Sequence, residues 1–478
     1  MRLAACTSSE AGDGECGSRP RSGWRSRLAE PRDSASLAAL RILVGAMMAF
    51  GLARFVAQGW VEKVLIEPTY FFKYPGFEWT VVGPPWVLYT HFAVTAGAAV
   101  CVSLGLFYRP AIVVYFLGFL YLQLLDVTLY LNHYHLVILV SGIFCLLPLG
   151  ERASLDVWLG RRPRRATVPA WMIYLLRLQV TVVYLHAALA KAQPDWLLHA
   201  QPLGIWLRAR SEVPVLGDLF AQPWAPMLFS WGGFLYDLTI WIFLLVPRTR
   251  GWAYLAVLGF HGCTWLLFDI GMFPVIMAVL TTVFFEPNWP TRIRDRLRRR
   301  LGESPPAPRA SGARPVSLGL AAALVLYSAF QLLFPLRSHL MSDSVLWTEL
   351  GMRYSWKVMV REKNGDVTYR VRSKVTGREW QVPAEKYLTW RQLSDMSGQP
   401  DLIMDLGKHV AWDFRRRGLG PVEVRVDAWV SLNGRPARRL VDPTIDVETI
   451  DRAHGMSAWI APPPTEPPLA AHPWTPSS

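Results

Sequence analysis

Ionisable side chains interrupt several segments of this sequence that are otherwise apolar. They are Arg41, Asp126, Arg177, His186, Lys191, Asp237 and His261. A charged group in the hydrocarbon core of a bilayer is costly, so such residues are rare there and are candidates for function. The alternative is a buried polar network that fixes helix packing, and we favour it for Arg41 and Asp237 taken singly.

Two sets of polar residues are spaced by seven. Asp126 and His133 are seven apart, which would place them on one helix face, and Asn132 precedes His133. The second set has the same spacing and comprises Arg177, Tyr184 and Lys191. Both sets are predicted to end at the same membrane face, and His261 lies about two turns below that face on a later segment. We therefore predict a pocket that is lined by these three segments and opens outward.

Lys191 is the candidate general base of this pocket. An apolar setting favours the neutral amine of a lysine over its ammonium, and a neutral amine can accept a proton. A lysine at a helix end can instead extend to the lipid headgroups. His133 can likewise be an ordinary histidine at the membrane interface. The residues by themselves leave both interpretations open.

Several chemistries lack their motifs in this sequence. There is no Walker A sequence, no nucleophile-elbow serine, no His-Glu-x-x-His and no Gly-rich dinucleotide turn. This argues against ATP-driven transport, serine hydrolysis, zinc proteolysis and NAD chemistry. The five cysteines show no metal-ligand spacing, so we expect no metal site and no disulfide framework.

Composition indicates the elements that must position these residues. Of 478 residues, 52% are hydrophobic and only 18% are charged, whereas soluble domains carry about 25% charged residues. We predict a multi-pass α-helical membrane protein with about nine spans and a small C-terminal β-containing soluble domain. The predicted spans are residues 37–57, 86–107, 110–131, 134–149, 169–190, 226–246, 252–269, 271–286 and 316–336.

Arginine clusters set the predicted orientation. With nine spans and a cytoplasmic N-terminus, the clusters at 19–32, 109, 152–165, 248–250 and 292–300 all fall inside the cell. The net charge of +14 is explained by these loops, and no nucleic-acid-binding motif accompanies it. We expect the C-terminal domain to lie outside and expect no nucleic-acid partner.

Four regions are predicted along the chain. Residues 1–35 form a polar, disordered arm; residues 36–337 form the transmembrane domain; residues 338–460 form an extracytoplasmic β-rich domain; and residues 461–478 form a Pro-rich tail. Strands are predicted at Ser355–Val360, Val367–Val371 and Val422–Val430. Asn364–Asp366 and Asn433–Gly434 are predicted turns.

Several segments resemble the vitamin K-dependent gamma-glutamyl carboxylases, which are HTTM-domain membrane proteins. In order along the chain they are Leu40–Gly45, Asn132–His133, Val183–Leu185, Lys191–Trp196, Phe260–His261, Phe268–Phe273, Pro287–Pro290, Tyr354–Trp356, Trp429–Asn433 and Asp442–Pro443. Each match is short, but their shared order spans most of residues 36–450. On this resemblance the chain is identified as a member of that family.

The resemblance implies a mechanism and a set of residues. In this family a neutral lysine deprotonates vitamin K hydroquinone, the quinol anion reacts with oxygen, and the resulting alkoxide removes a glutamate γ-proton. The carbanion then captures carbon dioxide, and vitamin K epoxide is the coproduct. The family lysine aligns with Lys191, and the family histidine aligns with His133 beside Asn132. The pocket or its surroundings would include Asp126, Arg177, Tyr184, Asp195, Trp196 and His261.

The implied partners are the bilayer, a lipid-soluble quinol of the menaquinone or phylloquinone type, and a glutamate-containing peptide. No metal is implied. The sequence departs from the animal enzymes because Ala190 replaces a second lysine, the soluble domain is short, and residues 340–478 contain no cysteine for a bridge to the membrane domain. These features resemble a bacterial plasma-membrane homologue.

Two alternatives remain open at this stage. One is a related enzyme that epoxidises or oxidises a quinol without carboxylating protein, because apolar pocket walls accept many isoprenoid tails. The other is a transporter on the same scaffold, since transporters also carry charges within the membrane. No convincing internal repeat supports the transporter interpretation.

Overall fold

The computed structural model describes residues 23–214, 216–300, 315–342, 344–452 and 456–468. Most of the predicted N-terminal arm and Pro-rich tail lies outside these residues. Five helices are long and apolar enough to cross a membrane. They are α2 (Ala35–Ala57), α3 (Pro85–Leu104), α7 (Ala170–Lys191), α11 (Ala225–Leu245) and the continuous run Leu318–Met341, which contains α15 (Leu318–Leu333) and α16 (Arg337–Met341).

Four further helices occupy the remaining predicted spans. Three are short apolar helices, namely α4 (Tyr108–Leu124), α5 (Asn132–Leu146) and α13 (Phe273–Thr281), which η4 extends to Phe284. The fourth is α12 (Arg250–Leu267). Each predicted span therefore contains a helix, but the count of nine membrane crossings is not confirmed.

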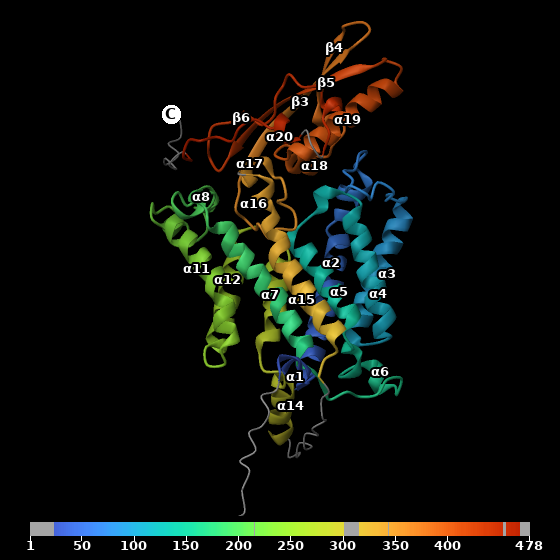
Figure 1. Cartoon of the computed structure of the whole chain (residues 1–478), viewed down its shortest axis with the longest axis vertical. Helices are drawn as coiled ribbons and strands as arrows, with labels where there is room; N and C mark the ends of the chain where they lie inside the picture. Colours follow the sequence, from blue (N-terminus) through green and yellow to red (C-terminus); the bar gives the residue numbers. More distant parts are fainter. Residues whose placement is uncertain (1–22, 215, 301–314, 343, 453–455, 469–478) are drawn as a thin grey trace, which may run out of the picture.

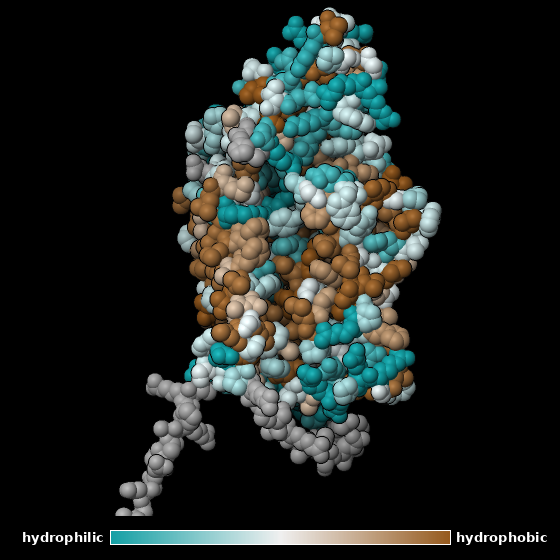
Figure 2. Space-filling view, turned by 45° about the vertical axis from the view of Figure 1, so that its right-hand side comes forward, coloured by the Kyte–Doolittle hydropathy of each residue, from teal (hydrophilic) through white to brown (hydrophobic). Residues whose placement is uncertain are grey.

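The helices form an upright bundle, with the C-terminal domain seated on one end (Figure 1). Helix α2 packs against α3, α3 against α4, α4 against α5, and α7 against α11. On the face that Figure 2 shows, apolar residues form a broad belt across the middle of the molecule, between more hydrophilic surfaces at the two ends. The belt has the character of a surface that faces lipid, since water would disfavour so much exposed apolar area.

The break between α4 and α5 corrects one prediction. Helix α4 ends at Leu124, and Asp126 caps a single 3-10 turn, accepting hydrogen bonds from the backbone N–H and the hydroxyl of Thr128 at 2.8 and 2.9 Å. An aspartate that bonds backbone two residues ahead competes with helix formation. Asp126 and His133 therefore do not share a helix face, and Asn132 begins α5 instead of ending the preceding span.

The arginine-rich segments gather at the end of the bundle opposite the C-terminal domain. Figure 1 places α1 (Trp24–Ala29), α6 (Leu155–Trp158) and α14 (Trp289–Arg300) there. Strand β1 (Pro31–Asp33) pairs with β2 (Thr167–Pro169), and the guanidinium of Arg152 lies 2.7 Å from Asp33. Residues 24–33 are thus ordered by tertiary contacts, contrary to the disorder predicted from their polarity.

The C-terminal domain is a four-stranded antiparallel sheet with helices on one face. Its strand order is β4–β3–β5–β6, from β4 (Glu379–Pro383), β3 (Lys363–Ser373), β5 (Val422–Leu432) and β6 (Arg438–Arg439). Helix α19 (Pro400–Arg416) packs against β5. Burial alternates along β5, as expected for a sheet with one covered face.

The predictions for this domain were partly wrong. Two of the three strands are present, but Ser355–Val360 forms none, and Asn364–Asp366 lies inside β3 instead of in a turn. Asn433 and Gly434 do form a turn, with φ angles of 50° and 80°. The strand pattern failed at residues 355–360 because their apolar side chains pack across the domain junction and not within the sheet: Trp356 belongs to the core of the helical bundle.

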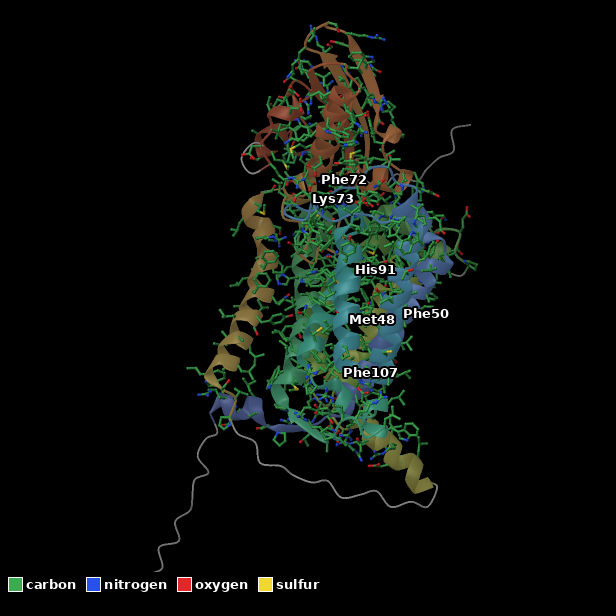
Figure 3. All side chains as sticks on the ribbon, turned by 90° about the vertical axis from the view of Figure 1, so that its right-hand side faces the viewer. Met48, Phe50, Phe72, Lys73, His91 and Phe107 are labelled. Carbon is green, nitrogen blue, oxygen red and sulfur yellow. The ribbon has the colours of Figure 1, made fainter. Side chains whose placement is uncertain are left out.

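Several contacts join the C-terminal domain to the bundle. Phe72 precedes α3, is fully buried, and packs in the core of the C-terminal domain (Figure 3). Asp126 accepts a hydrogen bond of 2.8 Å from the side chain of Gln392 on α18 (Trp390–Met396). The loops at this end of the bundle therefore pack against the C-terminal domain and support it.

We predict that the two ends of the molecule lie on opposite sides of the membrane. In a cysteine-free background, Thr376→Cys in the exposed β3–β4 turn should react with a membrane-impermeant maleimide in intact cells. Arg296→Cys on α14 should react only after permeabilisation. Labelling of both sites in intact cells, or the reverse pattern, would contradict this orientation.

Candidate functional site

Lys191 ends α7 and forms a buried ion pair. Its ammonium nitrogen lies 2.7 Å from Asp237 Oδ2 on α11, and the two side chains are only 8% and 7% exposed. The same nitrogen lies 5.3 Å from the ring centre of Trp196. Lys191 therefore does not extend to the headgroups, and its position is set by a carboxylate and an indole.

The pair faces a small cavity of about 100 Å³ with largely aromatic walls. Within it, the hydroxyl of Tyr184 lies 3.2 Å from Nε2 of His261, while Nδ1 of His261 is buried with no hydrogen-bond partner in the described structure. The aromatic walls are Trp196, Trp206, Phe229, Phe260, Phe268 and Phe273. An apolar wall with a few converging polar groups is typical of a ligand pocket.

Asn132 and His133 line a second and much larger cavity of about 1290 Å³. Both lie at the first turn of α5, where Asn132 Oδ1 accepts a hydrogen bond of 3.1 Å from Tyr130. His133 is 7% exposed, and Gly271 passes close to its ring with a φ of 61°. A Cβ at Gly271 would lie 3.8 Å from that ring, which leaves enough space for it. The positive φ, and not a lack of space, is therefore what favours glycine at this position.

The two cavities share one wall. Phe268, Ile270, Phe273, Val358 and Met359 line both. Phe273 lies between the two histidine rings, with ring centres 6.2 Å from His133 and 6.1 Å from His261. The structure thus places Lys191, Tyr184 and His261 in one cavity and Asn132 and His133 in the adjoining one, where the sequence suggested a single pocket.

Arg177 and Asp126 lie away from both cavities. Arg177 is about 21 Å from Lys191 along α7, and its guanidinium donates to the carbonyls of Val283, Phe284 and Phe285. Asp126 sits at the domain junction, where burial raises the pKa of its carboxyl to about 6 although Thr128 and Gln392 donate to it. Neither residue lines the cavity beside Lys191.

Asp195 fastens the segment after Lys191 to the C-terminal domain. Its two carboxylate oxygens accept bonds of 2.6 and 2.7 Å from Arg435, and Asn433 donates a third bond of 2.8 Å. Burial alone would raise the pKa of Asp195, but these donors outweigh it and hold the pKa below its usual value. The indole of the next residue, Trp196, donates to the Ser230 carbonyl at 2.8 Å.

Asp237 is the site residue that sequence reasoning missed. It was interpreted as a packing residue, yet it contacts the candidate base directly. A signal was available, because an acid and a base within separate apolar spans tend to pair with one another. Many other charges offered possible pairings, and only the packing of α7 against α11 selects this one.

Comparison with known families matches both parts of the chain. The family model described as the HTTM domain matches residues 29–289, which is more than half of the 478 residues. The model described as the vitamin K-dependent gamma-carboxylase lumenal domain matches residues 318–466. No solved structure matches this chain.

Arg435→Gln should weaken the attachment of the C-terminal domain. Removing one partner of a buried ion pair leaves an unpaired charge and costs about 3–5 kcal/mol, and these side chains are only 10% and 12% exposed. We expect thermal unfolding of the purified protein to occur several degrees lower. Arg438→Gln, which removes an exposed pair with Glu466, is the matched control and should change the melting temperature little.

The same difference should depend on pH. Since the pKa of Asp195 is depressed in the folded protein, the stability it contributes is present above the unfolded value of about 3.9 and is lost as the pH falls below it. The gap between wild type and Arg435→Gln should be largest near neutral pH. It should narrow on acidification, because the Asp195 carboxyl of the variant, which has lost Arg435, takes up a proton at a higher pH than that of the wild type. A gap that widens on acidification would contradict the assigned ion pair.

Proposed function

This chain belongs to the HTTM-domain family and carries the lumenal domain of the vitamin K-dependent gamma-carboxylases, and from that premise we propose that it epoxidises a vitamin K hydroquinone with molecular oxygen and couples this to carboxylation of protein glutamate. It would accordingly act as a carbon–carbon lyase. We further propose a bacterial plasma membrane as its location, with the C-terminal domain outside. The observation that carries the proposal is the buried Lys191–Asp237 pair in an aromatic cavity.

The residues fit a quinol in this region. A flat aromatic ring can stack on the aromatic walls beside Lys191, and Nδ1 of His261 is a buried polar atom with no hydrogen-bond partner among the described residues. The adjoining large cavity has exposed apolar residues on its rim, including Phe50 and Trp265. When bound, the quinol supplies an oxidisable ring whose reaction with oxygen drives removal of a glutamate γ-proton.

Lys191 would accept the proton of a quinol hydroxyl. In that step the O–H bond breaks and an N–H bond forms, so a neutral amine becomes an ammonium. The neighbouring Asp237 carboxylate, 2.7 Å away, stabilises the ammonium where no water can. The ion pair as it stands then corresponds to the state after proton transfer, and the proton must leave before the next turnover.

Asn132 and His133 would act from the other side of the shared wall. Both side chains can donate hydrogen bonds toward the larger cavity, and fixed donors stabilise developing negative charge on oxygen. The packing of His133 against Tyr134, with ring centres 4.5 Å apart, holds its imidazole in place. In this proposal, Lys191 on α7 abstracts the proton, and Asn132 and His133 on α5 stabilise the anion that forms.

Lys191→Ala should reduce epoxide formation by at least about 100-fold, because a positioned general base contributes roughly that factor. The measurement is vitamin K epoxide formed by purified protein in nanodiscs, supplied with hydroquinone and oxygen. Wild-type epoxide yield that persists in Lys191→Ala would eliminate the assigned base. Incorporation of labelled bicarbonate into a glutamate peptide, measured in parallel, distinguishes coupled carboxylation from quinol oxidation alone.

Asp237→Asn should slow epoxide formation by at least about tenfold, since a hydrogen bond to a charged group contributes about 1.5–3 kcal/mol. The asparagine keeps the shape and a hydrogen-bond acceptor but cannot neutralise the ammonium. Asp218→Asn is the control, because Asp218 is exposed and lines neither cavity. Equal rates for wild type and Asp237→Asn would remove Asp237 from the mechanism.

A further inference from the structure

The larger cavity contains two guanidinium groups that form no ion pair with any residue that the structure describes. Arg54 comes from α2 in the membrane domain, and Arg391 comes from α18 in the C-terminal domain. The Nε atom of each is buried and donates no hydrogen bond within the described structure. Neither group forms an ion pair among the described residues, whereas Arg353 and Arg435 each pair with a carboxylate. The carboxylate of Asp395 acts electrostatically on Arg391 but forms no ion pair with it.

Both guanidiniums are held in place by neutral contacts. Arg54 donates to the side-chain oxygen of Gln58 at 3.0 Å, and Arg391 lies over the ring of Trp60 at 5.1 Å. Gln58 and Trp60 also line the cavity. Both guanidiniums act electrostatically on the hydroxyl of Tyr134, so they surround the same part of the cavity.

The domain junction fixes the position of Arg391. The next residue, Gln392, donates 2.8 Å hydrogen bonds to Asp126 and to the carbonyl of Tyr70, both in the membrane domain. Thr389 and Gln392 also form a capping box at the start of α18. Asp126 therefore serves, through Gln392, to hold Arg391 over the cavity.

The lining of the cavity combines two kinds of residue. Phe50, Trp265 and Val275 are apolar and are 60%, 64% and 41% exposed (Figure 3 labels Phe50). The two arginines, Gln58 and Asn132 supply polar groups to the same lining. Asp269 also lines the cavity, but its carboxylate bonds to Arg210 at 3.1 Å and is 99% exposed, so it does not neutralise the arginines.

A partly buried guanidinium without an anion is costly, and its planar fork matches a carboxylate with two parallel hydrogen bonds. We propose that Arg54 and Arg391 form a binding site for the side-chain carboxylate of a glutamate in a peptide substrate, adjacent to His133. This inference rests on the proposed function and names the residues that would select its acidic substrate. Phosphate groups of anionic lipids are another anion that arginines at this end of the bundle could bind, and the test below distinguishes them from a glutamate peptide.

The test is direct binding of peptide to full-length protein in nanodiscs of zwitterionic lipid, with no quinol present. A fluorescent peptide containing glutamate is compared with the same peptide containing glutamine. Wild type should bind the glutamate peptide more tightly. Arg54→Gln and Arg391→Gln should each weaken that binding about 10- to 100-fold and leave glutamine-peptide binding unchanged.

Control variants guard against misfolding and non-specific charge effects. Arg416→Gln removes an exposed arginine that also stacks on a tryptophan, at 5.2 Å from Trp412, but lies outside the cavity. It should bind like wild type. Arg391→Lys keeps the charge over Trp60 and loses the planar fork, so it should bind glutamate peptide with intermediate affinity.

Three outcomes would overturn the inference. They are equal binding of the two peptides, glutamate binding that survives both glutamine substitutions, and arginine-dependent binding of anionic-lipid nanodiscs without any preference for the glutamate peptide. Because this assay measures peptide binding without the epoxidation reaction, failure of the arginine site can be distinguished from failure of the proposed function. Arginine-dependent glutamate binding in a protein that forms no epoxide would reject the proposed function and leave an acidic-peptide site.

Discussion

The lipid around this protein cannot solvate a charge, so a buried ionisable group needs a partner, which is supplied by the fold or by a ligand. Arg41, fully buried in α2, donates to the carbonyls of Val102, Ser103 and Ala153 at 2.6–2.7 Å and thereby ties three segments together. Arg177 performs the same role for the end of α13. Lys191 is different because its partner is a carboxylate, and a carboxylate can stabilise a gained proton where a carbonyl contributes far less. The need to give buried charges a partner therefore holds the helices together. It also distinguishes the candidate base, Lys191, from the arginines that have a structural role.

The same requirement joins the two domains. Among the residues that the structure describes, the soluble domain is attached by polar side chains that reach across the junction: Arg435 and Asn433 to Asp195, Gln392 to Asp126, and the backbone of Tyr354 to the hydroxyl of Tyr130. These contacts lie a few residues from Lys191 on one side and from Asn132 on the other. Movement of the soluble domain would therefore be transmitted to both candidate catalytic segments. The domain contributes to the site itself as well, since Val358 and Met359 form part of the wall between the two cavities.

Two adjoining cavities suit a reaction that combines an apolar and a polar reactant. The cavity beside Lys191 is small and aromatic, and the cavity beside His133 is large and opens to apolar and cationic rims. In the proposed reaction, a quinol would occupy the aromatic cavity and an acidic side chain the larger one, so the two reactants would meet at the shared wall. Exclusion of water from the meeting point would protect a strongly basic species from being quenched.

The sequence by itself determined the apolar segments, the end of the molecule where the arginines gather, and the family, because hydropathy, charge and short motifs are local properties of a chain. It also identified Lys191, His133 and Asn132 as candidates through their place in apolar segments and through family resemblance.

Only the tertiary structure decided which charges meet. Asp237, Arg54 and Arg391 are distant from Lys191 and His133 along the chain. Helix periodicity could neither assign Asp237 to Lys191 nor show that the two arginines form no ion pair with a described residue. The seven-residue spacing of Asp126 and His133 likewise misled, because α4 ends at Leu124 and the Asp126 carboxylate bonds the backbone of Thr128 in a separate turn before α5. Pairing in a low-dielectric interior depends on packing between segments, and that information lies in the fold and not in any one stretch of sequence.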